Sequence, residues 1–100
     1  DDPNYHGVFT GSWRTRDSMY HQGPAWSWLL GPFISAHLRA YGDQAAARRL
    51  LDAALDGLYD GCAGSVSELF DGDPPHYPRA ACAQAWGVAE LLRVWRELEG

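Results

Sequence analysis

The side chains best suited to chemistry lie close together in residues 64–86, GSVSELFDGDPPHYPRAACAQAW. This stretch contains one glutamate, two aspartates, one histidine and one arginine, and it carries three aromatic rings beside them. A connection of this length in a small domain is usually functional or disordered, and its aromatic content argues against disorder. It is therefore the first candidate for an active site.

Glu68 lies on a stiff part of this stretch. Pro74, Pro75 and Pro78 exclude a helix after it, and flanking glycines mark residues 65–71 as an extended segment. A catalytic carboxylate must be held within about 0.5 Å of its working position, so a stiff loop suits one. The alternative is a solvated acidic loop without chemistry, since an unperturbed carboxylate simply stays ionised.

A second stretch, YHQGPAWSW at residues 20–28, also places aromatic rings beside hydrogen-bonding groups. Aromatic rings cover the apolar faces of a pyranose, while carboxylate, amide and guanidinium groups bind its hydroxyls. The two stretches together therefore suit a sugar-binding site. Trp26 and Trp28 could equally be packing residues, because buried aromatic rings dominate protein cores.

Charge and composition narrow the class of partner. The net charge is −5 and all eight cationic residues are arginines, which disfavours nucleic acid as a partner. No apolar run approaches the roughly 20 residues that a membrane span needs, and no signal peptide is visible. We therefore expect a cytoplasmic protein that binds neither nucleic acid nor membrane.

Metal and redox chemistry have little support in the sequence. Four side chains could supply metal ligands, but their spacing matches no known ligand pattern. These four are His21, Asp71, Asp73 and His76. Cys62 and Cys82 could pair, yet without secretory signals we expect reduced, semi-buried thiols. The sequence predicts no cofactor.

The first predicted helix overlaps the second stretch, and a second predicted helix follows the first. Apolar residues at helical spacing predict the first helix over residues 24–42, ended by Gly42 and bent at Gly31-Pro32, which would place both tryptophans on a short arm. Asp43 is the predicted N-cap of the second helix, which would end between residues 61 and 64. The short link predicts an antiparallel hairpin.

A third helix is predicted over residues 79–98, after the candidate site. Its apolar residues surround most of the helix, which predicts burial on most sides. Residues 1–23 show no periodicity and are expected to form an ordered loop. The sequence thus predicts an all-α chain of three main helices joined by a long ordered loop.

The apolar content is high for so short a chain, at 46% hydrophobic residues with five tryptophans. Three short helices cannot easily hide this much apolar surface from water. We therefore expect partner surface, either more of the same polypeptide or a second subunit in a homo-oligomer. His37, on the apolar side of the first helix, is expected to be a packed core histidine.

Two segments resemble one known family. YHQGPAWSWLLGPF at residues 20–33 and SVSELFDGDPPHYPRAACAQAWGVAE at residues 65–90 are similar, in that order, to the C-terminal region of the glycogen debranching enzyme family, its amylo-alpha-1,6-glucosidase domain. The resemblance implies the C-terminal portion of an (α/α)6 barrel like that of glucoamylases. Residues 1–100 would then be an incomplete segment of a glycosidase-type barrel domain.

The resemblance also implies an activity and a set of site residues. It implies an inverting glycoside hydrolase acting on alpha-glucan branch points, with Glu68 as general base and the general acid on an earlier loop of the barrel. Arg79 would lower the pKa of this base if its guanidinium lay close. The residues that the resemblance assigns to sugar contact are Tyr20, His21, Trp26, Trp28, Asp71, His76, Arg79 and Gln84.

This sequence departs from the family pattern near the site. Pro24 stands where the pattern has Thr, Ser27 where it has Pro, and Ala80-Ala81 where it has Gly-Cys, so loop geometry and specificity can differ. The alternative function is a non-catalytic carbohydrate-binding or subunit-interaction module. A barrel-sized upstream sequence with a loop carboxylate would favour the enzyme, and a natural Met start near residue 1 would favour the module.

Overall fold

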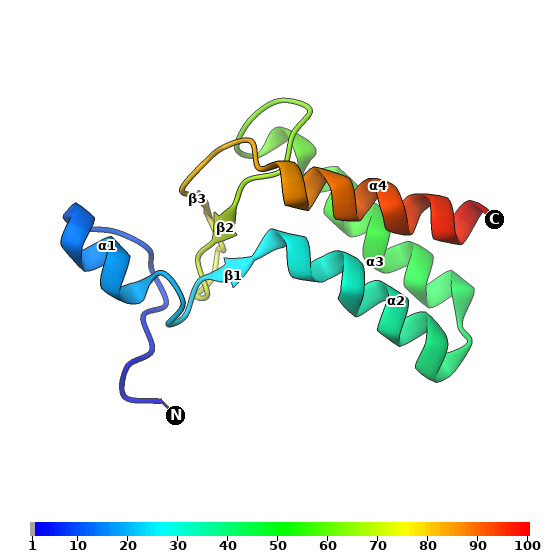
Figure 1. Ribbon diagram of the computed structural model, residues 1–100, viewed down its shortest axis with the longest axis horizontal. Helices are drawn as coiled ribbons and strands as arrows, with labels where there is room; N and C mark the ends of the chain where they lie inside the picture. The colour runs from blue at the N-terminus through cyan, green and yellow to red at the C-terminus, as the bar shows by residue number, and fades with distance from the viewer. Residues whose placement is uncertain (1) are drawn as a thin grey trace.

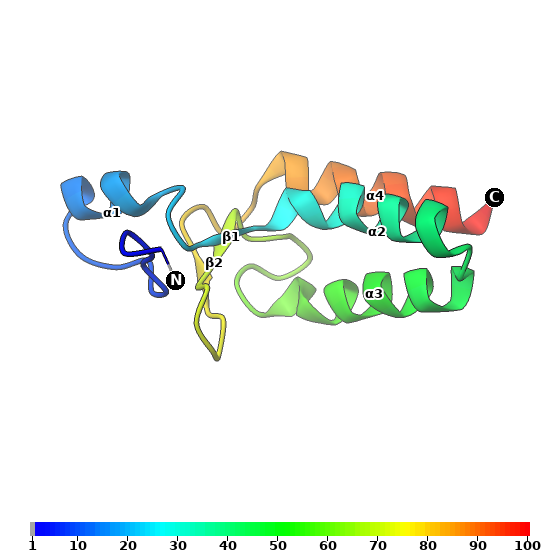
Figure 2. The same ribbon diagram turned by 90° about the horizontal axis from the view of Figure 1, so that it is seen from below.

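The computed structural model describes residues 2–100, an elongated body of about 44 × 32 × 20 Å. Three helices pack side by side, and a small sheet separates them from a fourth, short helix (Figure 1, Figure 2). The helices are α1 (Trp13–Met19), α2 (Leu30–Tyr41), α3 (Gln44–Asp56) and α4 (Ala85–Glu99). The strands are β1 (Ala25–Trp26), β2 (Leu69–Phe70) and β3 (Pro78–Arg79), and 3-10 turns occupy η1 (Ser27–Leu29) and η2 (Gly57–Tyr59). The all-α class is confirmed.

Helix α1 was not predicted, since residues 1–23 were expected to form a loop. Ser12 caps it, because its Oγ accepts a hydrogen bond from the Thr15 N–H at 3.3 Å. The helix has seven residues and buries only Met19. So short an element with one buried side chain shows no apolar period for a sequence to reveal.

Helix α2 begins later than predicted and has no break in its middle. Residues 25–26, expected to be helical, form β1, and the α-helix starts only at Leu30. Pro32 therefore falls in the first turn, where a backbone N–H has no helical partner to lose. The expected bend at Gly31-Pro32 is replaced by the start of the helix. Gly42 ends α2 as predicted, with a φ of 64°.

Helix α3 confirms the predicted N-cap and hairpin. Asp43 Oδ1 accepts a hydrogen bond from the Ala46 N–H at 2.8 Å, and α3 runs back antiparallel along α2 (Figure 2). The α-helix ends at Asp56, and η2 carries one more turn to Tyr59. The predicted end between residues 61 and 64 is therefore too late.

Helix α4 begins at Ala85, whereas the sequence predicted Arg79. Pro78 and Arg79 instead pair with β2, and Ala80 has a left-handed φ of 59°, which no helix tolerates. Gln84 is the N-cap of the helix, and its side-chain oxygen accepts from the Gly87 N–H at 2.6 Å. Small residues favoured helix in the sequence, but strand pairing decides the backbone here.

The main core lies between the three long helices. Its buried members are Ile34, Ala47, Leu51, Val66, Leu91, Val94 and Leu98. A second, smaller core joins the N-terminal segment to the sheet through Phe9, Met19 and Leu69, with Tyr20 and Trp26 packed against it. Among residues 2–100, no helix combines the length and hydropathy that a membrane crossing requires.

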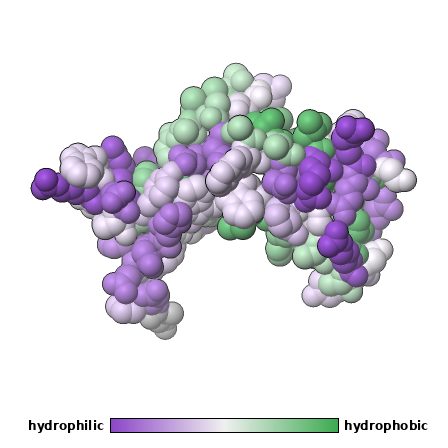
Figure 3. All heavy atoms as spheres, viewed as in Figure 1, coloured by the Kyte–Doolittle hydropathy of each residue, from purple (hydrophilic) through white to green (hydrophobic). Residues whose placement is uncertain are grey.

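Helix α4 is buried on one side only, so the expectation of burial around most of it is wrong within residues 2–100. Val88, Leu92 and Trp95 are exposed apolar side chains on one side of α4, which we call the outer α4 face; Trp86 is also exposed but lies on another side of the helix. In Figure 3, green apolar atoms gather along the upper edge of the molecule, whereas purple polar atoms dominate the α1 end. His37 is half-buried and does not belong to the core, and its Nδ1 finds no hydrogen-bond partner among the residues that the structure describes.

Helices α2 and α4 approach closely at a glycine. A Cβ added to Gly31 would lie 2.7 Å from the Cβ of Glu90 and 3.1 Å from its carbonyl oxygen. Neither atom is the free end of a flexible side chain, so the two helices would have to separate.

We expect Gly31→Ala to lower the free energy of unfolding by about 1 to 3 kcal/mol, although alanine has the better helix propensity. Gly57→Ala is the matched control, because a Cβ there meets only Asp60 Oδ2 at 3.5 Å and φ is −76°. Urea denaturation of both variants measures the difference. Equal stability of the two variants would show that the approach at Gly31 is not tight.

Candidate functional site

Strand β2 brings the two candidate stretches together. It pairs antiparallel with β1 on one side, Trp26 opposite Leu69, and with β3 on the other, Arg79 opposite Leu69. Leu69 is fully buried beneath this pairing. Residues that lie more than 40 positions apart in the chain thereby become neighbours, as Ser27 and Glu68 show in their 3.2 Å backbone hydrogen bond.

Glu68 immediately precedes β2 and is fixed through its backbone on both sides. Its carbonyl accepts from the Ser27 N–H, and its own N–H donates to the Ala81 carbonyl at 2.8 Å. A side chain on so constrained a backbone has few orientations available. Of the extended segment expected over residues 65–71, Leu69–Phe70 form strand β2, whereas Ser65 and Glu68 lie at bends.

The Glu68 carboxylate is half-buried and accepts two hydrogen bonds. The Tyr20 hydroxyl donates to Oε1, and the Ala81 N–H donates to Oε2 at 3.3 Å. Burial, and then the hydrogen bond and charge of Glu68, raise the pKa of Tyr20 to about 12. The phenol therefore stays protonated, and remains a donor, across the pH range in which proteins are stable.

Aromatic rings surround the Tyr20 end of this contact. The Trp26 ring lies edge-on to Tyr20 with centroids 4.8 Å apart, and His21 stacks on Trp26 at 5.0 Å with an interplanar angle of 5°. Trp26 Nε1 donates to the Tyr20 carbonyl at 3.2 Å. Trp26 thus lies beside the partner of Glu68, and strand β1, instead of the expected helix bend, places it there. Trp28 packs edge-on against Trp86, with centroids 6.2 Å apart.

Arg79 pairs with Asp71, so the condition under which it would lower the pKa of Glu68, a guanidinium close to that carboxylate, is not met by this pairing. Its Nη2 lies 2.8 Å from Asp71 Oδ2, and its Nε lies within 3.1 Å of both carboxylate oxygens. Asp71 is buried and also accepts from the Phe9 N–H at 2.8 Å. Burial alone would raise the pKa of Asp71, but Arg79 and the Phe9 N–H outweigh it, so the pKa is lowered.

The other predicted site residues have mixed surroundings. His21 and His76 are exposed, and His76 Nδ1 lies 3.0 Å from the Asp71 carbonyl oxygen. The Gln84 side chain caps α4.

Within residues 2–100, no cluster of three or more His, Cys, Asp or Glu side chains is placed to hold a metal ion. Cys62 and Cys82 are free thiols, Cys62 half-buried and Cys82 exposed.

Comparison with protein-family models shows to which family this chain belongs. Residues 1–93 match the family model described as amylo-alpha-1,6-glucosidase. This chain belongs to the amylo-alpha-1,6-glucosidase family. The family is one of glycoside hydrolases. Searches of curated proteins and of solved structures gave no match to this chain.

Two site features of this amylo-alpha-1,6-glucosidase family chain were missed by sequence reasoning. The Ala81 N–H is a backbone donor, which no residue type reveals, and Phe9 reaches Asp71 from 62 positions away. Both lie outside the residues that the resemblance assigned. The aromatic content of residues 1–23 is a sequence signal that could have indicated packing of the segment that contains Phe9.

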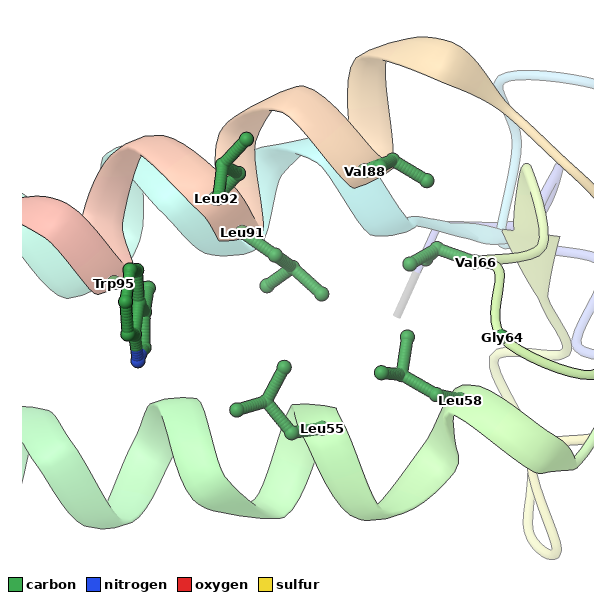
Figure 4. A pocket seen from close by; sticks show the side chains of 8 residues that line it. All are labelled: Leu55, Leu58, Gly64, Val66, Val88, Leu91, Leu92 and Trp95. Atoms are coloured by element: carbon green, nitrogen blue, oxygen red, sulfur yellow. The ribbon is translucent and has the colours of Figure 1, made fainter.

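The groove between α3 and α4 is separate from the predicted site. It has a volume of about 390 Å³, and Figure 4 shows Leu91 and Trp95 of α4 facing Leu55 of α3 and Leu58 of η2. Its lining is apolar and contains none of the predicted site residues. This groove therefore lacks the polar groups that a sugar site needs.

We expect Asp71→Asn to lower the free energy of unfolding at pH 7 by about 2 to 4 kcal/mol, because it breaks a buried ion pair. A lowered folded-state pKa means that the carboxylate stabilises the fold above the unfolded pKa of about 3.9. That contribution is lost as pH falls through the folded-state pKa.

The deficit of Asp71→Asn should therefore shrink below about pH 4, which urea denaturation at several pH values can measure. Asp52→Asn is the matched control, since this exposed carboxylate pairs with Arg48 within one helix and should contribute little at either pH. A deficit for Asp71→Asn that does not change with pH would contradict the assignment.

Proposed function

We propose that this chain carries the general base of an inverting glycoside hydrolase that acts on branch points of alpha-glucans, and that Glu68 is this base. The observation that supports it most is the Glu68 carboxylate, held by the Tyr20 hydroxyl and the Ala81 N–H beside exposed and half-exposed aromatic rings. The family match supplies the reaction class. The linkage and the role of Glu68 are our proposal.

The geometry of Glu68 is compatible with activation of water. Each carboxylate oxygen has two lone pairs, and each uses one on its described donor. One lone pair on either oxygen therefore remains to accept a proton from an attacking water. In an inverting enzyme the acid and base lie roughly 6.5 to 9.5 Å apart, which leaves room for that water.

The general acid must come from another group. Asp71 is unsuitable, because its lowered pKa keeps it ionised and its oxygens are taken by Arg79 and the Phe9 N–H. Asp73 Oδ1 accepts from the Tyr5 hydroxyl at 2.9 Å, and Asp73 itself is exposed. We propose that a loop in another part of an (α/α)6 barrel supplies the acid, with residues 1–100 as a C-terminal segment of that domain.

Apart from Tyr20, which bonds to Glu68 itself, the residues assigned to sugar contact divide into two groups by their surroundings. His21, Trp26, Trp28 and His76 are exposed or half-exposed and can face a pyranose. Asp71, Arg79 and Gln84 are engaged with other protein groups and are better suited to hold the loop that carries Glu68. We propose that the first group contacts sugar and that the second group supports the site.

The outer α4 face supports the barrel proposal. Leu92 is 56% exposed and Trp95 is 39% exposed, and both line the apolar groove of Figure 4. Contiguous exposed apolar surface marks an interaction site. We propose that further helices of the barrel cover it. The same observation is the one that favours the second candidate function, a subunit-interaction module without catalysis.

We expect Glu68→Gln in the intact protein to reduce glucose release from a branched limit dextrin on the order of 10²- to 10⁴-fold, because the amide cannot accept the proton. Glu99→Gln is the control, since this exposed glutamate pairs with Arg48 at the far end of α4. Near wild-type turnover by Glu68→Gln would overturn the assignment and leave the interaction module as the better proposal.

We also expect the isolated 100-residue chain to self-associate through the outer α4 face. The double variant Leu92→Glu with Trp95→Glu places charges on that face and should give a monomer by light scattering. Arg49→Glu, an exposed charge change on α3, is the matched control and should leave association unchanged. A monomeric wild-type chain would argue against both the missing helices and a subunit interface.

A further inference from the structure

We propose that Tyr20 is a positioning residue for Glu68 and does not itself contact the sugar. The inference rests on the proposed function, in which Glu68 is the general base. It changes the role that the family resemblance assigned to Tyr20, from substrate contact to orientation of the base. The decisive geometry is the hydrogen bond from the Tyr20 hydroxyl to Glu68 Oε1.

Tyr20 is held firmly enough to orient another side chain. It follows the last residue of α1, and its N–H donates to the Asp17 carbonyl at 3.4 Å. Its carbonyl accepts from Trp26 Nε1, and its ring packs between Phe9 at 5.8 Å and Trp26 at 4.8 Å. Contacts through backbone, carbonyl and ring leave the phenol little freedom.

Two donors on different oxygens define the orientation of the Glu68 carboxylate. Tyr20 approaches Oε1 from the N-terminal segment, and the Ala81 N–H approaches Oε2 from the segment before α4. A single donor would leave the carboxylate free to rotate about its last bond. Orientation matters because a misplacement of about 1 Å can cost 10²-fold in rate.

The hydroxyl of Tyr20 has one proton, which it donates in the hydrogen bond to Glu68. Tyr20 could donate a hydrogen bond to a sugar hydroxyl only if its hydrogen bond to Glu68 were broken. The raised pKa of Tyr20, about 12, keeps that proton in place, so the contact persists over the working pH range. A sugar-contact role is therefore the weaker explanation of this side chain.

Tyr20→Phe in the intact protein tests the proposal, because it keeps the ring that packs on Phe9 and Trp26 and removes only the donor. We expect kcat to fall roughly 10- to 100-fold with KM changed less than about twofold. In the Glu68→Gln background the same change should cause little further loss, because Tyr20 acts through Glu68. Tyr5→Phe is the matched control, since Tyr5 also donates to a carboxylate, that of Asp73, and is exposed.

The possible results separate the two proposals. A raised KM with unchanged kcat would make Tyr20 a sugar contact, and an additive loss in the Glu68→Gln background would make its role general to the fold. Either result overturns the inference while the base assignment stands. If Glu68→Gln alone retained wild-type turnover, the proposed function would fail first.

A second measurement does not depend on activity. In protein with labelled tyrosine rings, the Tyr20 signal, identified by its loss in Tyr20→Phe, should not titrate between about pH 8 and 11, because the pKa of Tyr20 is raised to about 12. In Glu68→Gln the pKa of Tyr20 should fall below its wild-type value but stay above that of a free tyrosine, because the contribution of the carboxylate is removed and that of burial remains. Titration at the usual pKa in the wild-type protein would show that the hydrogen bond is absent.

Discussion

The antiparallel pairing of β2 with two other strands is the constraint on which the rest of this structure depends. Each strand has only two residues, yet the pairing places Trp26 and Arg79 on either side of Leu69. An isolated pair of such strands is at most marginally stable in water. Here Leu69 is fully buried among Phe9, Met19 and neighbouring rings, and this packing supplies what the few ladder hydrogen bonds do not.

Two carboxylates three positions apart have been given different surroundings by this small sheet. Asp71 is buried, paired with Arg79 and bonded to the Phe9 N–H, so it is committed to holding the loop. Glu68 is half-buried, and its partners within residues 2–100 are neutral donors, a phenol and a backbone N–H. Separate environments for neighbouring carboxylates are how proteins assign them separate tasks. This division supports Glu68, and not Asp71, as the group left free for chemistry.

The three packed helices support the loop that carries Glu68. Helices α2, α3 and α4 bury a continuous core from Ile34 to Leu98, and the tight approach at Gly31 fixes α4 against α2. Helix α4 begins at the end of the loop that carries Glu68. The position of α4 therefore fixes the C-terminal end of that loop. Its outer face remains apolar and exposed, which is consistent with further helices packing there.

Much of the fold was accessible from the sequence because its signals are local. Gly42 and Asp43 marked the junction of α2 and α3, since a left-handed cap and a capping carboxylate depend only on adjacent residues. The prolines and glycines around Glu68 likewise indicated an extended, ordered segment. The motif order was sufficient to identify the family, which the match over residues 1–93 confirms.

Other features were decided only by tertiary structure. Strand pairing turned Ala25–Trp26 and Pro78–Arg79 away from the helices that their neighbours favoured, because a ladder with a distant segment outweighs local propensity. The same folding brought Arg79 to Asp71 instead of Glu68 and brought Tyr20 to Glu68 from 48 positions away. Local sequence determined which residues could form caps, turns and helices. Which carboxylate received the arginine and which the phenol depended on contacts between segments that are distant in the chain.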